Sequence, residues 1–144
     1  MNMAMRIGLL RWQSCMEEIN KCMDEEKIRI INQKIGLSEL KKIAHERFGD
    51  MIKTVVDLEK EIMAIGGEMH ADEERILLER GSKQENLWGI NLYPDSIGEN
   101  FVEFDSMINI RPRQDNRSRS VENEEIRKEI VNLVNKLVDY GSNT

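Results

Sequence analysis

The sequence predicts a single α+β domain with a largely antiparallel sheet, helices on one face of that sheet and an additional amino-terminal helix. Three observations lead to this fold class. The length of 144 residues fits one domain of ordinary size. Stretches with strand patterns alternate with stretches of helical spacing, without an internal repeat. A composition of 33% charged and 40% apolar residues is typical of a soluble protein whose core needs neither disulfides nor a metal.

The first segment predicts a helix with a heptad pattern. Its apolar residues recur at alternating steps of four and three, and they are Met5, Leu9, Trp12, Met16, Ile19 and Met23. A lone helix of this length is marginal in water, so it packs either on its own domain or on a second copy of the chain. A third alternative is that translation starts at Met16 or Met23. We therefore divide the chain into a helical extension (1–26), an α+β domain (27–140) and a frayed tail (141–144).

The first half of the domain predicts a strand, a helix and a strand pair. Residues 28–32 form a short apolar strand. A helix follows over residues 38–48, with Ser38 at its N-cap and Gly49 at its C-cap. Residues 52–65 fit one helix or two strands, and we favour two strands because β-branched residues cluster at the start and two glycines close the end.

The second half predicts two helices and two further strands. Asp72 caps a short helix that ends at Gly81, and residues 88–92 alternate as a strand. The clearest alternation in the chain runs over residues 102–111, which we expect to be a strand with its polar side chains on one face. Asn123 caps the last helix, whose apolar residues form one stripe.

Composition also excludes several classes of protein. A net charge of −6 makes general nucleic-acid binding an unfavoured function, because duplex affinity depends on neutralising phosphates. There is no apolar run of the roughly twenty residues that a membrane helix needs, and no secretory signal. Cys15 and Cys22 would be about 10 Å apart on one helix, too far for a disulfide within the chain. We expect a cytoplasmic protein with reduced thiols and no membrane partner.

Five short motifs lie between residues 66 and 118. They are GGEMHADEE (66–74), ERGSKQ (79–84), LWGINLYP (87–94), SMINIRP (106–112) and NRS (116–118). Together they resemble a family of short bacterial proteins that is classed only as a domain of unknown function. The resemblance covers roughly residues 28–138. It implies no activity, cofactor or partner, and it supports one domain with a separate amino-terminal extension.

The cluster of His70, Asp72 and Glu74 is the first candidate site. An imidazole and carboxylates brought together at the start of a helix could hold a divalent metal, with His70 and Asp72 as ligands, or act as a catalytic general base. The alternative is structural, because a helix cap and the helix dipole already account for the carboxylates.

The polar face of the strand predicted over residues 102–111 is the second candidate. Alternation places Glu103, Asp105, Asn109 and Arg111 together, and a neighbouring strand would add Asn91. Such a face could bind a polar ligand. The alternative is that one face of an antiparallel sheet simply remains in water.

The loop 111–120 is the third candidate. It carries four arginines and one aspartate in an acidic chain. Arg111, Asn116 and Arg117 could bind a small anion there, because guanidinium groups suit phosphate and carboxylate oxygens. The alternative is ion pairing of the arginines with the three glutamates at the start of the last helix, at positions 122, 124 and 125.

These observations favour a small binding or interaction module that forms homo-oligomers. The alternative function is a metal-assisted hydrolase of an anionic, phosphorylated substrate, in which the histidine cluster would supply ligands or base and Arg111 and Arg117 would clamp the anion. A third function is a regulatory partner of nucleic-acid machinery that uses only the arginine-rich loop.

Overall fold

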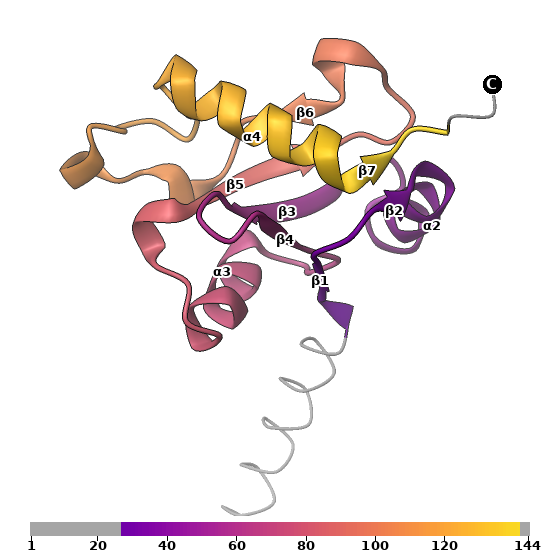
Figure 1. Ribbon diagram of the computed structural model, residues 1–144, viewed down its shortest axis with the longest axis horizontal. Coiled ribbons are helices and arrows are strands. Elements are labelled where there is room, and N and C mark those ends of the chain that lie inside the picture. Colours follow the sequence, from indigo (N-terminus) through magenta and orange to yellow (C-terminus); the bar gives the residue numbers. More distant parts are fainter. Residues whose placement is uncertain (1–26, 142–144) are drawn as a thin grey trace, which may run out of the picture.

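A five-stranded antiparallel sheet forms the centre of the structure, a computed structural model that describes residues 27–141 (Figure 1). From one edge to the other, its strands are β1 (Arg29–Ile31), β4 (Ile62–Ile65), β3 (Ile52–Asp57), β5 (Leu87–Leu92) and β6 (Val102–Glu103). The predicted helix over residues 1–26 and the last three residues lie outside the described part. Within that part, no helix has the length and apolar character needed to cross a membrane.

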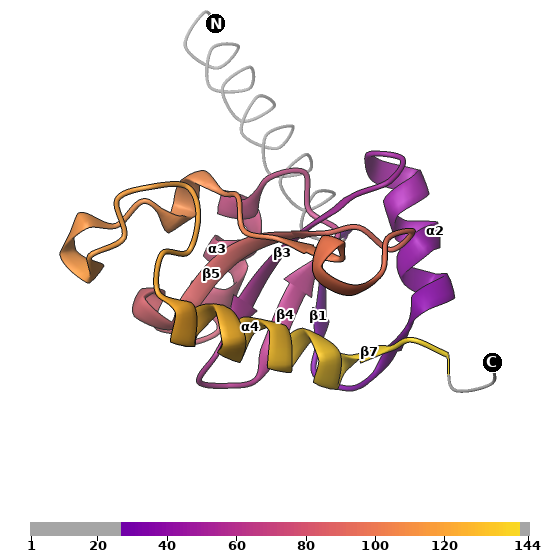
Figure 2. The same cartoon turned by 90° about the horizontal axis from the view of Figure 1, so that it is seen from above.

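Helices cover both faces of this sheet. The helices α2 (Leu37–Arg47) and α4 (Glu124–Leu137) pack with one face in the larger apolar cluster, and α3 (His70–Glu79) packs on the other face. Figures 1 and 2 show α4 lying across the sheet, on the side opposite α3. A short parallel pair, β2 (Ile35–Gly36) with β7 (Val138–Asp139), joins the start of α2 to the end of α4. The single α+β domain is confirmed, with helices on both sides of the sheet instead of one.

The central strand β3 explains why residues 52–65 are so apolar. Ile52 and Val56 face α2 and α4, whereas Val55 faces α3. A strand that is covered on both faces carries apolar residues at consecutive positions, so it lacks the alternation of polar and apolar residues that identifies a half-buried strand. The predicted pair of strands is confirmed, and the turn between them places Glu61 at a positive φ of 56°.

The predicted helix ends are confirmed at Gly49, Gly81 and Asn123, but two predicted N-caps are wrong. Asn123 Oδ1 accepts the first free backbone N–H groups of α4. In contrast, α2 begins directly after β2, which places Ser38 inside the first turn. Asp72 also lies inside a first turn, because α3 begins earlier, at His70, whose ring is hydrogen-bonded to the sheet.

The strand predicted over residues 102–111 is also wrong, because β6 stops at Glu103 and residues 107–109 form a 3-10 helix. Asn109 is completely buried, whereas Ile110 is 40% exposed. The reason lies in β5, where the Asn109 side chain takes the place of a neighbouring strand. Its Oδ1 accepts from the Gly89 N–H at 2.8 Å, and its Nδ2 donates to the Gly89 carbonyl at 2.9 Å.

Glu73 is a buried carboxyl group beneath the glycine pair at positions 66 and 67. A Cβ on Gly67 would lie 2.9 Å from Glu73 Cγ, so glycine is required for this packing. Glu73 Oε2 accepts from the Gly67 N–H at 3.1 Å. Burial raises the pKa of Glu73 well above its usual 4.5, so the folded protein keeps this carboxyl group protonated where an exposed one would ionise.

Replacing Glu73 by Gln is expected to stabilise the protein increasingly as pH rises. Below pH 4.5 the wild-type carboxyl group is neutral in both states. Above pH 4.5 the Glu73 carboxyl group ionises in the unfolded state but not yet in the folded state. The free energy of unfolding of the wild type therefore falls, by at most about 1.4 kcal/mol per pH unit. This fall ends where pH reaches the raised pKa of the folded state. Urea unfolding of both proteins between pH 4 and pH 8 measures this difference. The exposed Glu79→Gln is the matched control, and parallel pH curves for wild type and E73Q would contradict the expectation.

Candidate functional site

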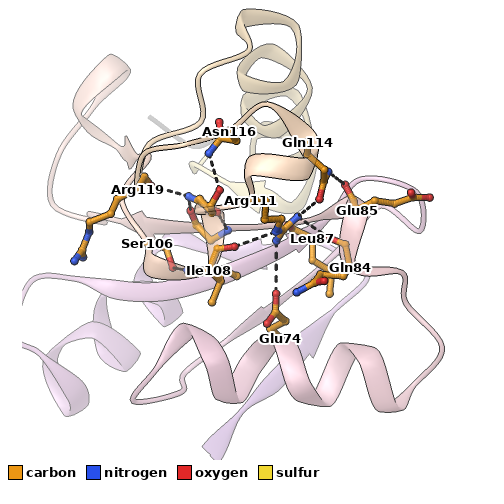
Figure 3. Close-up of polar contacts among 12 residues, drawn as sticks. Glu74, Gln84, Glu85, Leu87, Ser106, Ile108, Arg111, Gln114, Asn116 and Arg119 are labelled. Atoms are coloured by element: carbon orange, nitrogen blue, oxygen red, sulfur yellow. Dashed lines mark hydrogen bonds and ion pairs between the residues drawn. The ribbon is translucent and has the colours of Figure 1, made fainter.

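The guanidinium group of Arg111 holds together four separate segments of the chain (Figure 3). Nε donates to the Ile108 carbonyl at 3.0 Å, and Nη1 donates to the Gln84 carbonyl at 2.7 Å. Its remaining partners are Gln114 Oε1, the Leu87 carbonyl and, at 3.5 Å, the carboxylate of Glu74. Four of these contacts are hydrogen bonds, and Glu74 is an ion-pair partner without a hydrogen bond to the guanidinium group. The Arg111 side chain is only 8% exposed and is directed at groups of the protein, so it is poorly placed to bind an anion.

Glu74 and Arg111 form a largely buried ion pair between α3 and the edge of β5. Burial raises the pKa of Glu74, and the neighbouring Arg111 opposes that shift. Burial also lowers the pKa of Arg111, and Glu74 opposes that change. Each charge compensates the other, so the pair ties the helix to the sheet.

The arginine-rich loop is held together by Asn116, which was predicted to bind a ligand. Its Nδ2 donates to three backbone carbonyls, and its Oδ1 accepts from the Glu122 N–H at 2.8 Å. Arg117 keeps an exposed side chain. The Arg117 and Ser118 backbone N–H groups donate to Glu122, and this lowers the pKa of that carboxyl group. Glu122 thus binds the backbone of the loop, where ion pairs with guanidinium groups were the predicted alternative.

A hollow of about 480 Å³ opens between the N-terminal end of α3 and the β5–β6 edge of the sheet. It brings His70 of the first predicted candidate together with Asn91, Glu103 and Asp105 of the second. Its other polar lining residues are Lys53, Tyr93, Ser106 and Arg119, and its apolar ones include Met51, Met69, Met107 and Ile108.

Three side chains form a row across the floor of this hollow. Lys53 of β3 pairs with Asn91 of β5, and Asn91 pairs with Glu103 of β6. Residues directly opposite each other on antiparallel strands point to the same face, and here it is the α3 face. The order across the sheet is therefore cation, amide, anion.

Asn91 has a buried carbonyl oxygen that lacks a hydrogen-bond partner among residues 27–141. The side chain is 95% buried, since Asn91 is only 5% exposed. Its Nδ2 donates to Glu103 Oε1 at 2.8 Å and to the Asp105 carbonyl at 3.3 Å. These two contacts fix the amide orientation and direct Oδ1 away from them. No residue of the described part makes a well-formed hydrogen bond to Oδ1, although the His70 ring is near enough for the Asn91 side chain to raise its pKa.

His70 lines the same hollow and has one ring nitrogen free to accept a hydrogen bond. Its Nε2 lies 2.8 Å from the Ile90 carbonyl, which can only accept, so Nε2 carries the proton. Burial lowers the pKa of His70 below its usual 6.5, and the charge of Lys53 adds to this, although the Ile90 carbonyl and the Asn91 side chain oppose it. The ring is therefore neutral at pH 7, with a lone pair on Nδ1.

Glu103 and Asp105 differ in how their charges are compensated. Tyr93 Oη donates to Glu103 Oε1 at 3.0 Å, and burial together with this carboxylate raises the pKa of Tyr93 to about 12. Glu103 thus receives hydrogen bonds from two neutral groups, Tyr93 and Asn91. Asp105 instead pairs with Arg119 at 2.6 Å. The carboxylate of Glu103 has no ion pair in the described part of the chain.

The three members of the predicted metal or general-base cluster have different surroundings. His70 contacts Ile90, Glu74 pairs with Arg111, and Asp72 does not line the hollow. Over residues 27–141, no three His, Cys, Asp or Glu side chains are grouped so that they could hold a metal ion. His70 is thus the one member of this cluster that lines the hollow.

Lys53 and Tyr93 are the site residues that the sequence analysis missed. A signal for Lys53 was present, because it is the one charged residue in the buried stretch from Ile52 to Val56. Tyr93 belongs to the LWGINLYP motif. Neither signal shows which side chains share a hollow, because that depends on strand register.

Two other hollows give weaker evidence for a ligand site. The one beside α2 is lined mainly by charged side chains, of which Arg29 pairs with Glu39 at 2.6 Å and Arg47 pairs through Nη1 with Glu68 at 3.1 Å. Arg47 Nη2 is buried without a hydrogen-bond partner in the described residues. The one between α4 and residues 98–104 is mainly apolar. Among these three hollows, the one beside α3 contains the buried, unpaired Asn91 oxygen.

The comparison with protein families gives one match. Residues 29–137 match the model of the family described as Protein of unknown function (DUF5674). The chain belongs to this family. The resemblance predicted from the motifs is thereby confirmed, over nearly the same residues. No curated protein and no solved structure matches the chain. Membership in DUF5674 assigns no chemistry, so the function must be argued from the site.

Proposed function

We propose that this DUF5674 protein is a binding module whose hollow beside α3 takes a small polar ligand that donates hydrogen bonds. The observation that carries this proposal is the Oδ1 atom of Asn91, which is buried, oriented and unpaired. A buried polar atom without a partner costs about 1–3 kcal/mol. Because Oδ1 has almost no accessible surface, a ligand N–H would have to displace a neighbouring side chain to reach it, and it would then remove that cost.

The neighbouring groups strengthen the preference for a donor. His70 offers the lone pair of Nδ1, and Glu103 offers a carboxylate without an ion pair. Acceptors from α3, β5 and β6 thus line one hollow. A ligand that carries several N–H groups, such as an ammonium ion, would satisfy them together.

The contacts favour binding over the metal-assisted hydrolase considered from the sequence. The Arg111 guanidinium that would clamp an anion already makes four hydrogen bonds and one ion pair within the protein. The hydroxyl of Ser106 lines the hollow, but it is buried and accepts from the Ile108 N–H as a helix cap. Neither group is poised for hydrolysis.

Self-association and a cytoplasmic location remain separate predictions. The apolar seam between Met5 and Met23 belongs to the part of the chain that is not described. Ligand binding in the hollow does not depend on it, because all the residues that carry the proposal belong to residues 53–119.

Replacing Asn91 by Leu is expected to weaken the binding of a simple amine at least ten-fold, because the buried acceptor is lost. The probe is 3-methylbutylamine, titrated into the full chain and followed by NMR chemical shifts. In the wild type, saturable shifts should be confined to residues around the hollow. They should weaken as pH falls through the pKa of His70, since protonation removes its acceptor.

The exposed Asn132→Leu on α4 is the matched control and should bind the amine as the wild type does. Equal affinity in wild type and N91L, or shifts spread over the whole surface, would contradict the proposed site.

A further inference from the structure

We propose that the ligand of the hollow is a zwitterion of the α-amino-acid type with an apolar side chain. This inference rests on the proposed function and names the class of ligand. Asn91, His70 and Glu103 would bind the ammonium group, and Lys53 would bind the carboxylate. The methionines at the rim would contact the apolar side chain.

The row Lys53–Asn91–Glu103 has an uncompensated charge at each end. No carboxylate of the described residues pairs with Lys53, whose Nζ lies 5.2 Å from the centre of the Phe48 ring. Among the described residues, Glu103 is hydrogen-bonded to the neutral Asn91 and Tyr93 and to no cation. The nearby charges of Asp105 and Arg119 cancel each other. Within residues 27–141, the hollow therefore offers a lysine and a glutamate that have no partner of opposite charge.

The spacing of the row suits a short ligand. Neighbouring strands are about 4.8 Å apart, so the backbones that carry Lys53 and Glu103 are separated by about 10 Å. Two hydrogen bonds of about 2.8 Å, one at each end, leave room for a compact zwitterion between the side chains. Its ammonium group would then lie beside Asn91 Oδ1.

Charge complementarity separates this class of ligand from simpler ones. An amine without a carboxylate would bring a second positive charge near Lys53 and leave that lysine unpaired. An acid without an ammonium group would be repelled by Glu103 and would offer no donor to Asn91. A zwitterion satisfies both ends, and it leaves the net charge of the row unchanged.

An apolar wall completes the site. Met69 is 57% exposed and Met107 is 64% exposed, and both line the hollow with Met51 and Ile108. Methionine side chains are flexible and polarizable, so they adapt to apolar groups of different shape. An aliphatic side chain such as that of leucine would bury this exposed surface.

Isothermal titration of the full chain with three probes tests the inference. The probes are L-leucine, 3-methylbutylamine, which lacks only the carboxylate, and 4-methylpentanoate, which lacks only the ammonium group. We expect L-leucine to bind at least ten-fold more tightly than either. Lys53→Met should weaken the binding of L-leucine and should strengthen that of the amine, because the positive charge that repels the amine is removed, whereas the exposed Lys42→Met should change neither.

The outcomes separate this inference from the proposed function. If the amine binds as tightly as L-leucine, the zwitterion is wrong and the donor-binding hollow stands. If neither binds, both proposals are overturned. The three probes decide between these results on the wild type alone, so the test does not depend on how Lys53→Met folds.

Discussion

Replacing Arg111 by Met is expected to lower the free energy of unfolding by about 3–5 kcal/mol, the range for breaking a buried ion pair from one side. The carbonyls of Ile108, Gln84 and Leu87 would each lose a charged donor. Glu74 would keep a largely buried carboxylate without its partner. Urea unfolding followed by circular dichroism at pH 7 measures the loss.

Two variants separate the ion pair from the hydrogen bonds to the backbone. Glu74→Gln removes the carboxylate. The double variant R111M/E74Q should therefore lose less unfolding free energy than the sum of the losses of the two single variants, and the difference is the coupling energy of the pair. Arg113→Met is the control, because Arg113 is exposed in the same loop and its loss should stay within about 0.5 kcal/mol. A cost for R111M no greater than that for R113M would show that the Arg111 contacts do not stabilise the fold.

Elements with a local sequence pattern could be predicted. The helix α4 has an apolar stripe and a capping asparagine within one segment, and both are confirmed. The strand pair β3 and β4 was found from β-branched residues and two closing glycines. Each of these signals is complete within about fifteen residues, so no distant partner was needed to interpret it.

The segment from residue 102 to residue 111 could not be predicted, because its structure is decided by a partner far along the chain. Gly89 lacks a side chain, and a Cβ there would lie 2.5 Å from Ser106 Cβ. Ser106 and Asn109 can therefore lie against β5, where the Asn109 amide replaces strand pairing. Alternation of polar and apolar residues cannot distinguish this arrangement from a strand.

The candidate site, like the fold, could be predicted from the sequence only in part. His70, Asn91 and Asp105 were identified as polar residues that could carry function, but His70 was placed in a different cluster from Asn91 and Asp105. Their meeting depends on the register of three strands and on where α3 begins. Arg111 and Asn116 were predicted to bind a ligand, although their donors serve backbone carbonyls. A polar residue in a motif can stabilise the backbone as readily as it can bind a ligand.

Replacing Asn109 by Ala is expected to cost at least about 3 kcal/mol, because three backbone groups would lose their partners at once. These are the Gly89 N–H, the Gly89 carbonyl and the Arg119 carbonyl. In an antiparallel ladder the N–H and C=O of one residue point to the same side, so those of Gly89 face away from β3 and cannot be satisfied there. Urea unfolding measures the loss, and hydrogen exchange of the Gly89 amide should accelerate.

Asn109→Asp distinguishes the contribution of the Oδ1 acceptor of Asn109 from that of its Nδ2 donors. The carboxylate would still accept from the Gly89 N–H, but it would face two carbonyls that had received hydrogen bonds from Nδ2. N109D should therefore be destabilised at pH 7 and recover in part at pH 4, where a protonated oxygen can donate to one of them. The exposed Asn132→Ala serves as the control. Wild-type stability of N109A would mean that β5 keeps its edge without this amide, and the explanation of why residues 102–111 do not form a strand would fail.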